Sequence, residues 1–128
     1  MNLRALFDSC KPPYDRLEPF GCPPEFRRCI VSRFAIFVTV KLKPGTAEEF
    51  EPIILENATA AMRDEPECHE FHVMKNNEDP DTYHFFEVYS APSSLDAHRE
   101  TAHYKKFVSR TGDMVTEKHI QRVTMLNH

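Results

Sequence analysis

The sequence lacks the features that are typical of membrane proteins and of nucleic-acid-binding proteins. Its longest apolar run, from Phe34 to Val40, has the length of a strand and is too short to cross a bilayer. The formal net charge is -4, and basic residues are scattered among acidic ones instead of forming a patch. We therefore expect neither a membrane partner nor a nucleic-acid partner. The 128 residues are enough for one domain with a core and too few for two.

Cysteine is scarce, and motifs for metals and nucleotides are missing. The sequence has 4 cysteines, whose spacing gives neither a CxxC pair nor a zinc ribbon: Cys10, Cys22, Cys29 and Cys68. The HExxH zinc spacing and nucleotide-binding motifs are also missing. Because no secretory signal precedes the cysteines, we expect free thiols in a reducing compartment, and hence a cytoplasmic protein without metal or cofactor. A disulfide within the N-terminal segment is the alternative.

Proline is concentrated at the start of the chain. Half of the 10 prolines lie within residues 1–33, where they block regular helix and sheet pairing. This segment also carries several acidic residues, unlike a transit peptide, and it has no signal-peptide apolar core. We expect an irregular arm over residues 1–33 and a single folded domain over residues 34–128.

Four segments of the domain have the composition of strands. Residues 34–42 are β-branched and aromatic and are apolar on both faces. Residues 68–75 and 82–89 alternate and are joined by a polar turn, which predicts a hairpin. The strand over 82–89 places one carboxylate on a face with aromatic side chains: Tyr83, Phe85, Glu87 and Tyr89. A last strand is expected over residues 118–126.

The helix that follows the first strand has clear boundaries. Thr46 and Glu49 have the spacing of a capping box, and an apolar stripe at helical spacing follows them. The helix should end at residues 64–66, where a proline follows two acidic residues. Pro52 predicts either a kink or a regular part that starts only at about Glu51.

Two shorter helices are predicted before the last strand. Residues 91–94 offer an N-cap to the first, and the second runs from about Ala102 to Asp113, with Gly112 at its end. Its inward side chains should be Tyr104, Phe107 and Val108. The resulting order is β-α-β-β-α(α)-β, which is an α+β, ferredoxin-like domain. Because one sheet face keeps apolar side chains that no helix covers, we expect a homodimer.

A dense group of proton-transfer side chains lies near the C-terminus. His98 and His103 are five residues apart, which would put them on different faces of one helix. If the helix breaks near Thr101, both imidazoles can turn into one cavity and transfer protons near neutral pH. Glu87 in a pocket would have a raised pKa and could act as a base or an acid. Tyr104 could donate a hydrogen bond to a carbonyl or enolate oxygen.

Each of these residues also has a purely structural explanation. A helical histidine is commonly a surface or satisfied core residue, and Tyr104 fits a core position. Glu87 can pair with Arg99 or Lys118. Lys105 can bind an anionic group or simply face solvent. The candidate substrate-binding residues are Phe71, Phe85, Tyr89 and Lys105. We interpret the histidines of the predicted strands as structural: His69, His72 and His84.

Several short motifs around these residues resemble those of the antibiotic biosynthesis monooxygenase (ABM) domain family, over about residues 34–126. The motifs are Lys43-Pro44-Gly45, Arg63-Asp64-Glu65-Pro66-Glu67-Cys68, Asp79-Pro80-Asp81, Phe86-Glu87-Val88-Tyr89 and His98-Arg99-Glu100-Thr101-Ala102-His103-Tyr104-Lys105. Their combination is more specific than any one of them. Within the family, the small quinol monooxygenases and the isomerase of phosphorylated autoinducer-2 look most similar.

The resemblance implies a dimeric α/β barrel with one pocket per subunit and with neither metal nor flavin. It implies that His98 and His103 are the motif histidines, Glu87 the strand acid and Tyr104 the aromatic residue after the second histidine. Family members oxidise electron-rich phenols or quinols with O2, or rearrange small hydroxy-ketones. Haem-degrading relatives rely on a tryptophan, and the absence of tryptophan here argues against haem as the substrate.

We therefore expect a cofactor-independent monooxygenase that acts on a small quinol or polycyclic phenol by proton abstraction and direct reaction with O2. One alternative is an isomerase of small phosphorylated hydroxy-ketones, which needs a cationic phosphate clamp such as Lys105 and Lys106. The other is a non-catalytic dimeric ligand-binding module. It would be favoured if both motif histidines lay on the surface and aromatic side chains filled the pocket: Phe71, Phe85 and Phe86.

Overall fold

The computed structural model describes residues 33–127 of the chain. Its compact unit runs from Phe34 to Val123. The predicted arm, with three of the four cysteines, lies outside the described residues apart from its last position, so the arm and its boundary stay predictions. Cys68 is buried and makes no disulfide with any described residue. Among residues 33–127, no helix is both long and apolar enough to cross a membrane.

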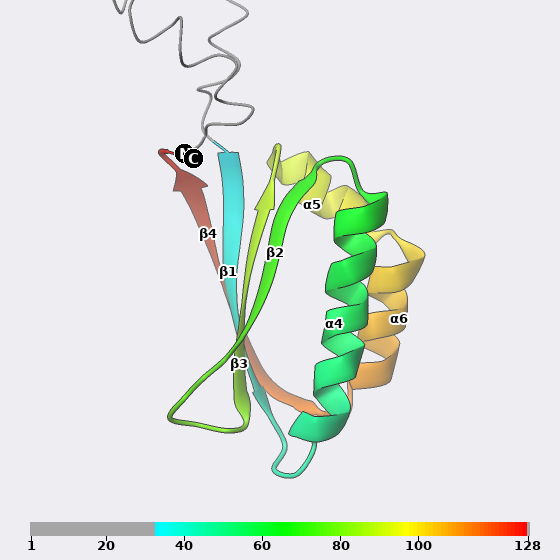
Figure 1. Ribbon diagram of the computed structural model, residues 1–128, viewed down its shortest axis with the longest axis vertical. Helices are drawn as coiled ribbons and strands as arrows, with labels where there is room; N and C mark the ends of the chain where they lie inside the picture. Colours follow the sequence, from blue (N-terminus) through cyan, green and yellow to red (C-terminus); the bar gives the residue numbers. More distant parts are fainter. Residues whose placement is uncertain (1–32, 128) are drawn as a thin grey trace, which may run out of the picture. The chain divides into compact units, whose positions relative to one another are not determined.

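The predicted ferredoxin-like fold is confirmed. The elements are β1 (Arg33–Leu42), α4 (Ala47–Asp64), β2 (Cys68–Lys75), β3 (Thr82–Tyr89), α5 (Pro92–Arg99), α6 (Ala102–Thr111) and β4 (Val115–Met125). The strands form one sheet in the order β2-β3-β1-β4, in which β3 pairs antiparallel with both β1 and β2. All three helices lie on one face of this sheet, as Figure 1 shows.

The core lies between the helices and this face of the sheet. Alternate residues of β1 point into it, namely Ile36, Val38, Val40 and Leu42, and each is at most 2% exposed. Phe50 and Ile54 of α4 are fully buried against them. Burying one such aliphatic or aromatic side chain contributes roughly 2 kcal/mol, so this layer holds α4 on the sheet.

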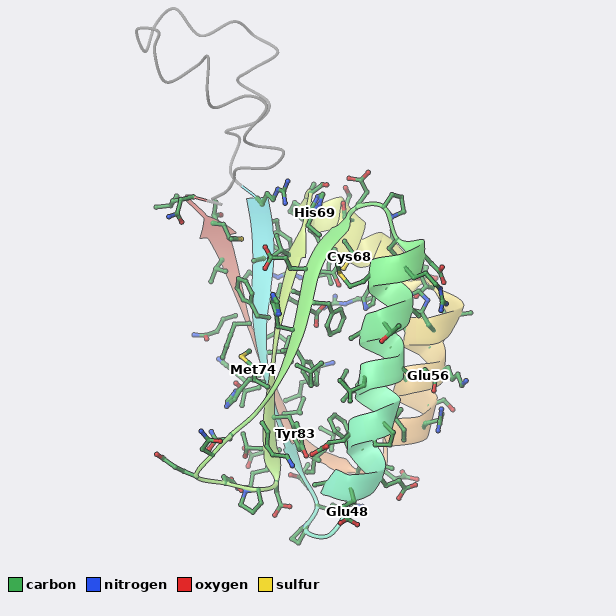
Figure 2. All side chains as sticks on the ribbon, in the orientation of Figure 1. Glu48, Glu56, Cys68, His69, Met74 and Tyr83 are labelled. Carbon is green, nitrogen blue, oxygen red and sulfur yellow. The ribbon has the colours of Figure 1, made fainter. Side chains whose placement is uncertain are left out.

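No helix of residues 33–127 lies over the opposite face of the sheet (Figure 1). Phe37 of β1 stacks on His84 of β3 with ring centroids 5.4 Å apart, and His72 of β2 stacks on Phe86 at 6.4 Å. Met74 lies on the sheet well away from the helices (Figure 2) and is 37% exposed. This partly exposed apolar face is the basis of the predicted homodimer, which stays a prediction.

The start of α4 differs from the prediction. Thr46 is the N-cap, but its hydroxyl donates to the carbonyl of Lys43 at 2.8 Å and caps no helical N–H, so the predicted capping box is wrong. The turn at Gly45, where φ is +87°, brings that carbonyl within reach. Pro52 lies inside one helix that runs without interruption from Ala47 to Asp64. The late start at Glu51 is therefore wrong, because burial of the apolar stripe outweighs one lost backbone hydrogen bond.

Two predictions near the C-terminus also need correction. Val108 is 43% exposed instead of inward, because α6 presents a narrow apolar side centred on the buried Phe107. β4 begins at Val115, three residues before the predicted start at Lys118. The extra residues are extended beside β1, where Thr116 donates a hydrogen bond to the carbonyl of Lys41 at 3.1 Å.

Candidate active site

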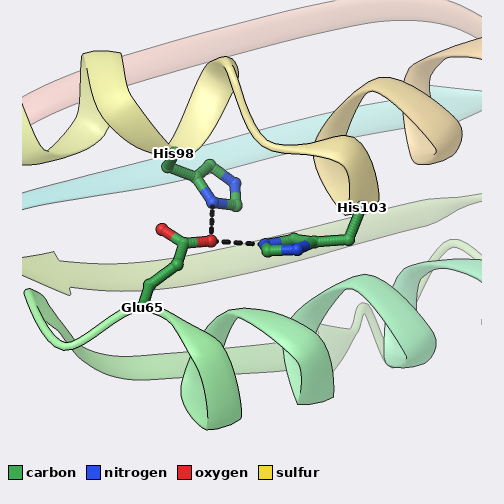
Figure 3. Close-up of side chains that lie close together, drawn as sticks. All are labelled: Glu65, His98 and His103. Atoms are coloured by element: carbon green, nitrogen blue, oxygen red, sulfur yellow. Dashed lines mark hydrogen bonds and ion pairs between the residues drawn. The ribbon is translucent and has the colours of Figure 1, made fainter.

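Glu65 occupies the junction between α4 and β2. It is the C-cap of α4, with extended backbone angles of φ -107° and ψ 105°. The following residue is Pro66, which disfavours helical geometry in the residue before it. The chain therefore leaves the helix at Glu65, and the carboxylate turns toward α5 and α6 (Figure 3).

A break between α5 and α6 directs both motif histidines to this carboxylate. α5 ends at Arg99, and Thr101 is the N-cap of α6. The Thr101 hydroxyl accepts a hydrogen bond from the N–H of Tyr104 at 3.2 Å and donates to the carbonyl of His98 at 2.7 Å. The helical phase thus restarts between His98 and His103, and the predicted break near Thr101 is confirmed.

The two imidazoles share one oxygen of Glu65. His98 Nδ1 lies 2.7 Å from Glu65 Oε2, and His103 Nε2 hydrogen-bonds to the same oxygen. Figure 3 shows the two contacts converging on that atom. Because a carboxylate only accepts, the neutral His98 carries its proton on Nδ1. Its Nε2 then holds a lone pair, as a general base requires.

His98 also borders a cavity between the sheet and the helices. The cavity offers about 30 Å³ to the centre of a water-sized molecule, and its walls are largely apolar. Its aromatic and aliphatic lining includes Phe71, Phe85, Phe107, Leu95, Ile36 and Ile54. Its polar lining consists of Asn57, Glu87, His98, Arg99, Tyr104 and Lys118. A small apolar molecule with a few polar substituents is the ligand that such a cavity suits.

The pKa values of the two buried acid–base groups are set mainly by burial. Burial lowers the pKa of His98, and the hydrogen bond that His98 donates to Glu65 only partly offsets this. His98 is therefore neutral, and able to accept a proton, at neutral pH. Burial raises the pKa of Glu87 to about 7, against the hydrogen bond from Tyr89 at 2.7 Å and the positive charges of Lys118 and Arg99.

Local strand pairing explains why Glu87 is buried. In the sheet it lies between Ile36 of β1 and Phe71 of β2. It is 5% exposed and makes no ion pair with any residue from 33 to 127. The carboxyl group therefore titrates near neutral pH, in contact with the cavity, so it can either donate or accept a proton.

The structure brings most of the predicted site residues together. His98, Glu87, Tyr104, Phe71 and Phe85 all border the cavity, and the Tyr104 ring lies 5.0 Å from that of His98. His103 does not line this cavity. It is linked to the cavity-lining His98 through Glu65, and it lines a more open groove on the outer side of α4 and α6.

Two predicted substrate-binding residues do not reach the cavity wall. Tyr89 is fully buried beside Glu87, and its hydroxyl donates to that carboxyl group. Lys105 is exposed and lies 3.3 Å from Glu100, because it points to the outer side of α6. We therefore assign Tyr89 the role of holding Glu87, and we remove Lys105 from the candidate site. The strand histidine His84 makes hydrogen bonds to Thr39 and Asn76 on the other face of the sheet, which fits a structural role.

Sequence reasoning missed two residues of the site. Glu65 was noted as the end of a helix and as part of a family motif but was given no role, although a glutamate directly before proline marks a carboxylate held at a helix end. Asn57 was not noted at all. Its signal is a polar residue three positions after Ile54, within the stripe that otherwise carries apolar side chains.

The carboxylate and the two imidazoles that share its oxygen also have the donor set of a metal site. Glu65, His98 and His103 each offer a ligand atom, and the three atoms lie within 4.8 Å of one another. Two imidazoles and one carboxylate suit a divalent transition metal such as iron, manganese or zinc. The same atoms also form a hydrogen-bonded triad, in which one carboxylate accepts from both imidazoles. Metal chelation is therefore a necessary control in any activity measurement on this site.

Comparison with known protein sequences identifies one family. A sequence model of the family described as “Antibiotic biosynthesis monooxygenase” matches residues 33–110. The “Uncharacterized protein sll1783” of Synechocystis is 27% identical over 78 residues, which make up 61% of this chain and 52% of that protein. The chain thus spans about half the length of this curated relative.

Solved structures share the fold. A protein from Nitrosomonas europaea named “Putative antibiotic biosynthesis monooxygenase” is 25% identical, with a TM-score of 0.66 over 72% of this chain and 86% of its own. A similarly named protein from Bacteroides thetaiotaomicron is 24% identical, with a TM-score of 0.70 over 73% of this chain and 90% of its own. The second likeness is one of fold alone.

Proposed function

Because the chain belongs to the antibiotic biosynthesis monooxygenase family, we propose that it is a cofactor-independent monooxygenase of a small quinol or polycyclic phenol. The observation that carries this proposal is a buried, neutral imidazole at the wall of a largely apolar cavity, with its second nitrogen fixed by a carboxylate. His98 is that imidazole. His103, the other predicted base, is a partner of Glu65 outside the cavity.

In the proposed reaction, His98 Nε2 removes a proton from the bound substrate. The imidazolium that forms is stabilised by Glu65, which accepts the Nδ1–H hydrogen bond and supplies the compensating charge. The electron-rich substrate anion then reduces O2, and a carbon–oxygen bond forms at the substrate carbon. A CH2 carbon becomes a carbonyl, and an aromatic C–H carbon of a quinol becomes the hydroxyl-bearing carbon of a hydroxyquinone. In both cases the substrate gains one oxygen atom and loses two hydrogen atoms net, and four electrons pass to O2. The second oxygen atom leaves as water with the two protons.

Two other cavity residues have roles in this scheme. Tyr104 lies beside His98 and donates a hydrogen bond to the substrate oxygen, whose negative charge grows after deprotonation. Glu87, with a pKa of about 7, supplies a proton to the oxygen atom that leaves as water. The apolar walls exclude bulk water and so protect the reactive anion.

The test is oxygen uptake by the purified protein with a panel of reduced quinols and hydroxylated polycyclic aromatics. We expect uptake by the wild type, loss by about 100-fold or more in His98→Ala, and a smaller loss in His103→Ala. His84→Ala, on the opposite face of the sheet, is the matched control and should retain full uptake. Retained uptake in His98→Ala would contradict the proposal, and loss of uptake after metal chelation would contradict its cofactor-independent form.

One observation favours the isomerase as a second candidate. Arg99 and Lys118 both border the cavity, and among residues 33–127 neither has a hydrogen-bonded or ion-paired partner. Burial lowers the pKa of Lys118, and Arg99 lowers it further. Such a pair of cations could hold a phosphate, in place of the expected Lys105 and Lys106. Turnover of a phosphorylated hydroxy-ketone under strict anaerobiosis would establish the isomerase.

The non-catalytic module is less well supported. Phe86 lies on the opposite face of the sheet, where it stacks on His72, and so does not fill the cavity. His98 is 2% exposed and borders the cavity, so the two motif histidines are not both surface residues.

A further inference from the structure

Asn57 presents a polar atom that the fold does not use. It lies in the middle of α4 and is 3% exposed. Among residues 33–127, its Oδ1 is the one buried side-chain nitrogen or oxygen atom without a hydrogen-bond partner. Leaving a buried acceptor unpaired costs stability, so such an atom in a native protein calls for a partner that is absent from the folded chain.

The position itself would suit an apolar side chain. Ile54, Ala58 and Ala61 on the same side of α4 are buried and apolar. A leucine at residue 57 has the same branching and the same number of side-chain heavy atoms, would continue that stripe and would leave nothing unpaired. The asparagine therefore contributes nothing to the packing of α4 that leucine would not.

Asn57 borders the same cavity as His98 and Glu87. It comes from the helix layer, whereas Glu87 comes from the sheet, so a molecule in the cavity contacts polar groups on both walls. A ligand in this cavity can supply the hydrogen-bond donor that the amide oxygen lacks.

We propose that Asn57 is a specificity-determining residue that accepts a hydrogen bond from a hydroxyl group of the substrate. The inference rests on the proposed function, because His98 removes one proton from the substrate. The hydroxyl at Asn57 must keep its proton, so it is a second hydroxyl, distinct from the group that His98 deprotonates. The preferred substrate class is therefore dihydroxy aromatic compounds, and simple monophenols are discriminated against.

A site that pairs with a substrate hydroxyl rejects the analogue that lacks it, because the buried acceptor is then left unpaired. The test compares hydroquinone with 4-fluorophenol, which replaces the second hydroxyl by fluorine. Binding is measured calorimetrically under nitrogen, so that no oxygen-dependent turnover takes place. We expect wild type to bind hydroquinone at least about tenfold more tightly.

Asn57→Leu should reduce this preference to less than about threefold, while 4-fluorophenol binds at least as tightly as to wild type. Asn77→Leu, the same substitution in the exposed hairpin turn, should keep the wild-type preference. Equal affinity of wild type for the two probes, or no binding of hydroquinone, would overturn the inference. So would a preference that survives in Asn57→Leu.

The melting temperature gives a second readout. Since the removed oxygen has no partner, ligand-free Asn57→Leu should melt at the same temperature as wild type or higher. A lower melting temperature with loss of both probes would show a structural role for Asn57 and overturn the inference. Binding does not need O2, so an Asn57-dependent preference without oxygen uptake would contradict the proposed reaction alone. Oxygen uptake by the wild type, together with a preference for hydroquinone that is unchanged in Asn57→Leu, would contradict this inference alone.

Discussion

Helix α4 carries a carboxylate near each end, and in both cases one oxygen receives two side chains. Near the start of the helix, Glu51 Oε2 accepts a hydrogen bond from the Tyr83 hydroxyl and lies 2.5 Å from Lys75 Nζ. After its end, Glu65 Oε2 receives the two imidazoles. Figure 2 shows how far apart the ends lie, with Tyr83 near one and Cys68 near the other.

The two clusters differ in charge and in exposure. Lys75 compensates the charge of Glu51, and the side chains are 56% and 36% exposed, so water and salt screen the pair. Glu65 is 12% exposed and faces two imidazoles, which carry no permanent positive charge. The first cluster fastens the helix to the hairpin. The second holds a negative charge ready for a histidine that becomes protonated.

Under the proposed function, the same side-chain chemistry is structural at one site and reactive at another. A shared carboxylate oxygen is common to both clusters, so it does not distinguish them. Contact with the cavity and the absence of a permanent positive charge distinguish the Glu65 cluster. Matched substitutions of the carboxylates on and near α4 test this difference.

The largest difference is expected in the pH dependence of stability. Glu87 has its pKa raised from 4.5 to about 7, so the folded protein keeps a proton that the unfolded chain releases. The resulting cost is absent below pH about 4.5, grows up to pH about 7 and is complete above it. The free energy of unfolding of Glu87→Gln, relative to that of wild type, should therefore increase by about 3 kcal/mol between pH 4 and pH 8. The measurement is urea unfolding at the two pH values.

Glu51→Gln should show the opposite sign. Lys75 and Tyr83 lower the pKa of Glu51, so its contribution is present above the unfolded pKa and is lost as the pH falls. The loss of stability in Glu51→Gln at pH 8 should be small, because the Glu51–Lys75 pair is exposed. Equal effects of the two substitutions would show that burial does not distinguish the carboxylates of Glu87 and Glu51.

The next largest effect is expected on catalysis. Glu65→Gln removes the charge that stabilises the His98 imidazolium, and oxygen uptake with the best quinol should fall roughly 100-fold. Glu51→Gln, the matching change at the other end of α4, should stay within about twofold of wild type. Equal losses in the two variants would point to a general effect on α4 and would contradict the assignment of Glu65.

The pH profile of oxygen uptake should reveal the same base. Burial lowers the pKa of His98 from its ordinary value of 6.5, so the acid limb should lie below pH 6.5. The rate should fall about tenfold for each pH unit below that pKa, because only the neutral imidazole accepts a proton. Glu51→Gln should leave the limb in place. An acid limb above pH 6.5 would assign the base to another group.

The smallest effect is expected at the exposed end. Tyr83→Phe removes the hydrogen bond to Glu51 and keeps the buried ring, so stability should fall by about 1 kcal/mol. Oxygen uptake should not change. A loss of uptake would show that the two ends of α4 are coupled.

The fold could be predicted from the alternation of apolar and polar residues in strands and from the helical spacing of apolar residues, because both patterns reflect burial of one face. The first three strands in sequence and the shared face of Tyr83, Phe85, Glu87 and Tyr89 were predicted correctly for this reason. The capping box at Thr46 failed because the backbone of Thr46 is helical, with φ -103° and ψ -2°, whereas a capping residue normally has an extended backbone, as Thr101 has. These angles depend on loop geometry, which a spacing rule does not contain.

The site was only partly predictable. The break at Thr101 could be inferred from the distance between the two histidines, since a continuous helix would separate them. Glu65 could not be connected to them, because it comes from another helix and is more than 30 residues away in sequence. Tyr89 and Lys105 were misplaced because residue type indicates chemical capacity, whereas access to the cavity depends on packing.

The junction between α5 and α6 also limits how the sequence can change by insertion and deletion. Each residue added to or removed from a helix rotates everything beyond it by about 100°. A single insertion in α6 before His103 would turn the imidazole away from Glu65, although no side chain of the cluster had been replaced. The spacing between the two histidines is therefore itself an inherited property, and relatives that differ by one residue there must hold Glu65 in another way.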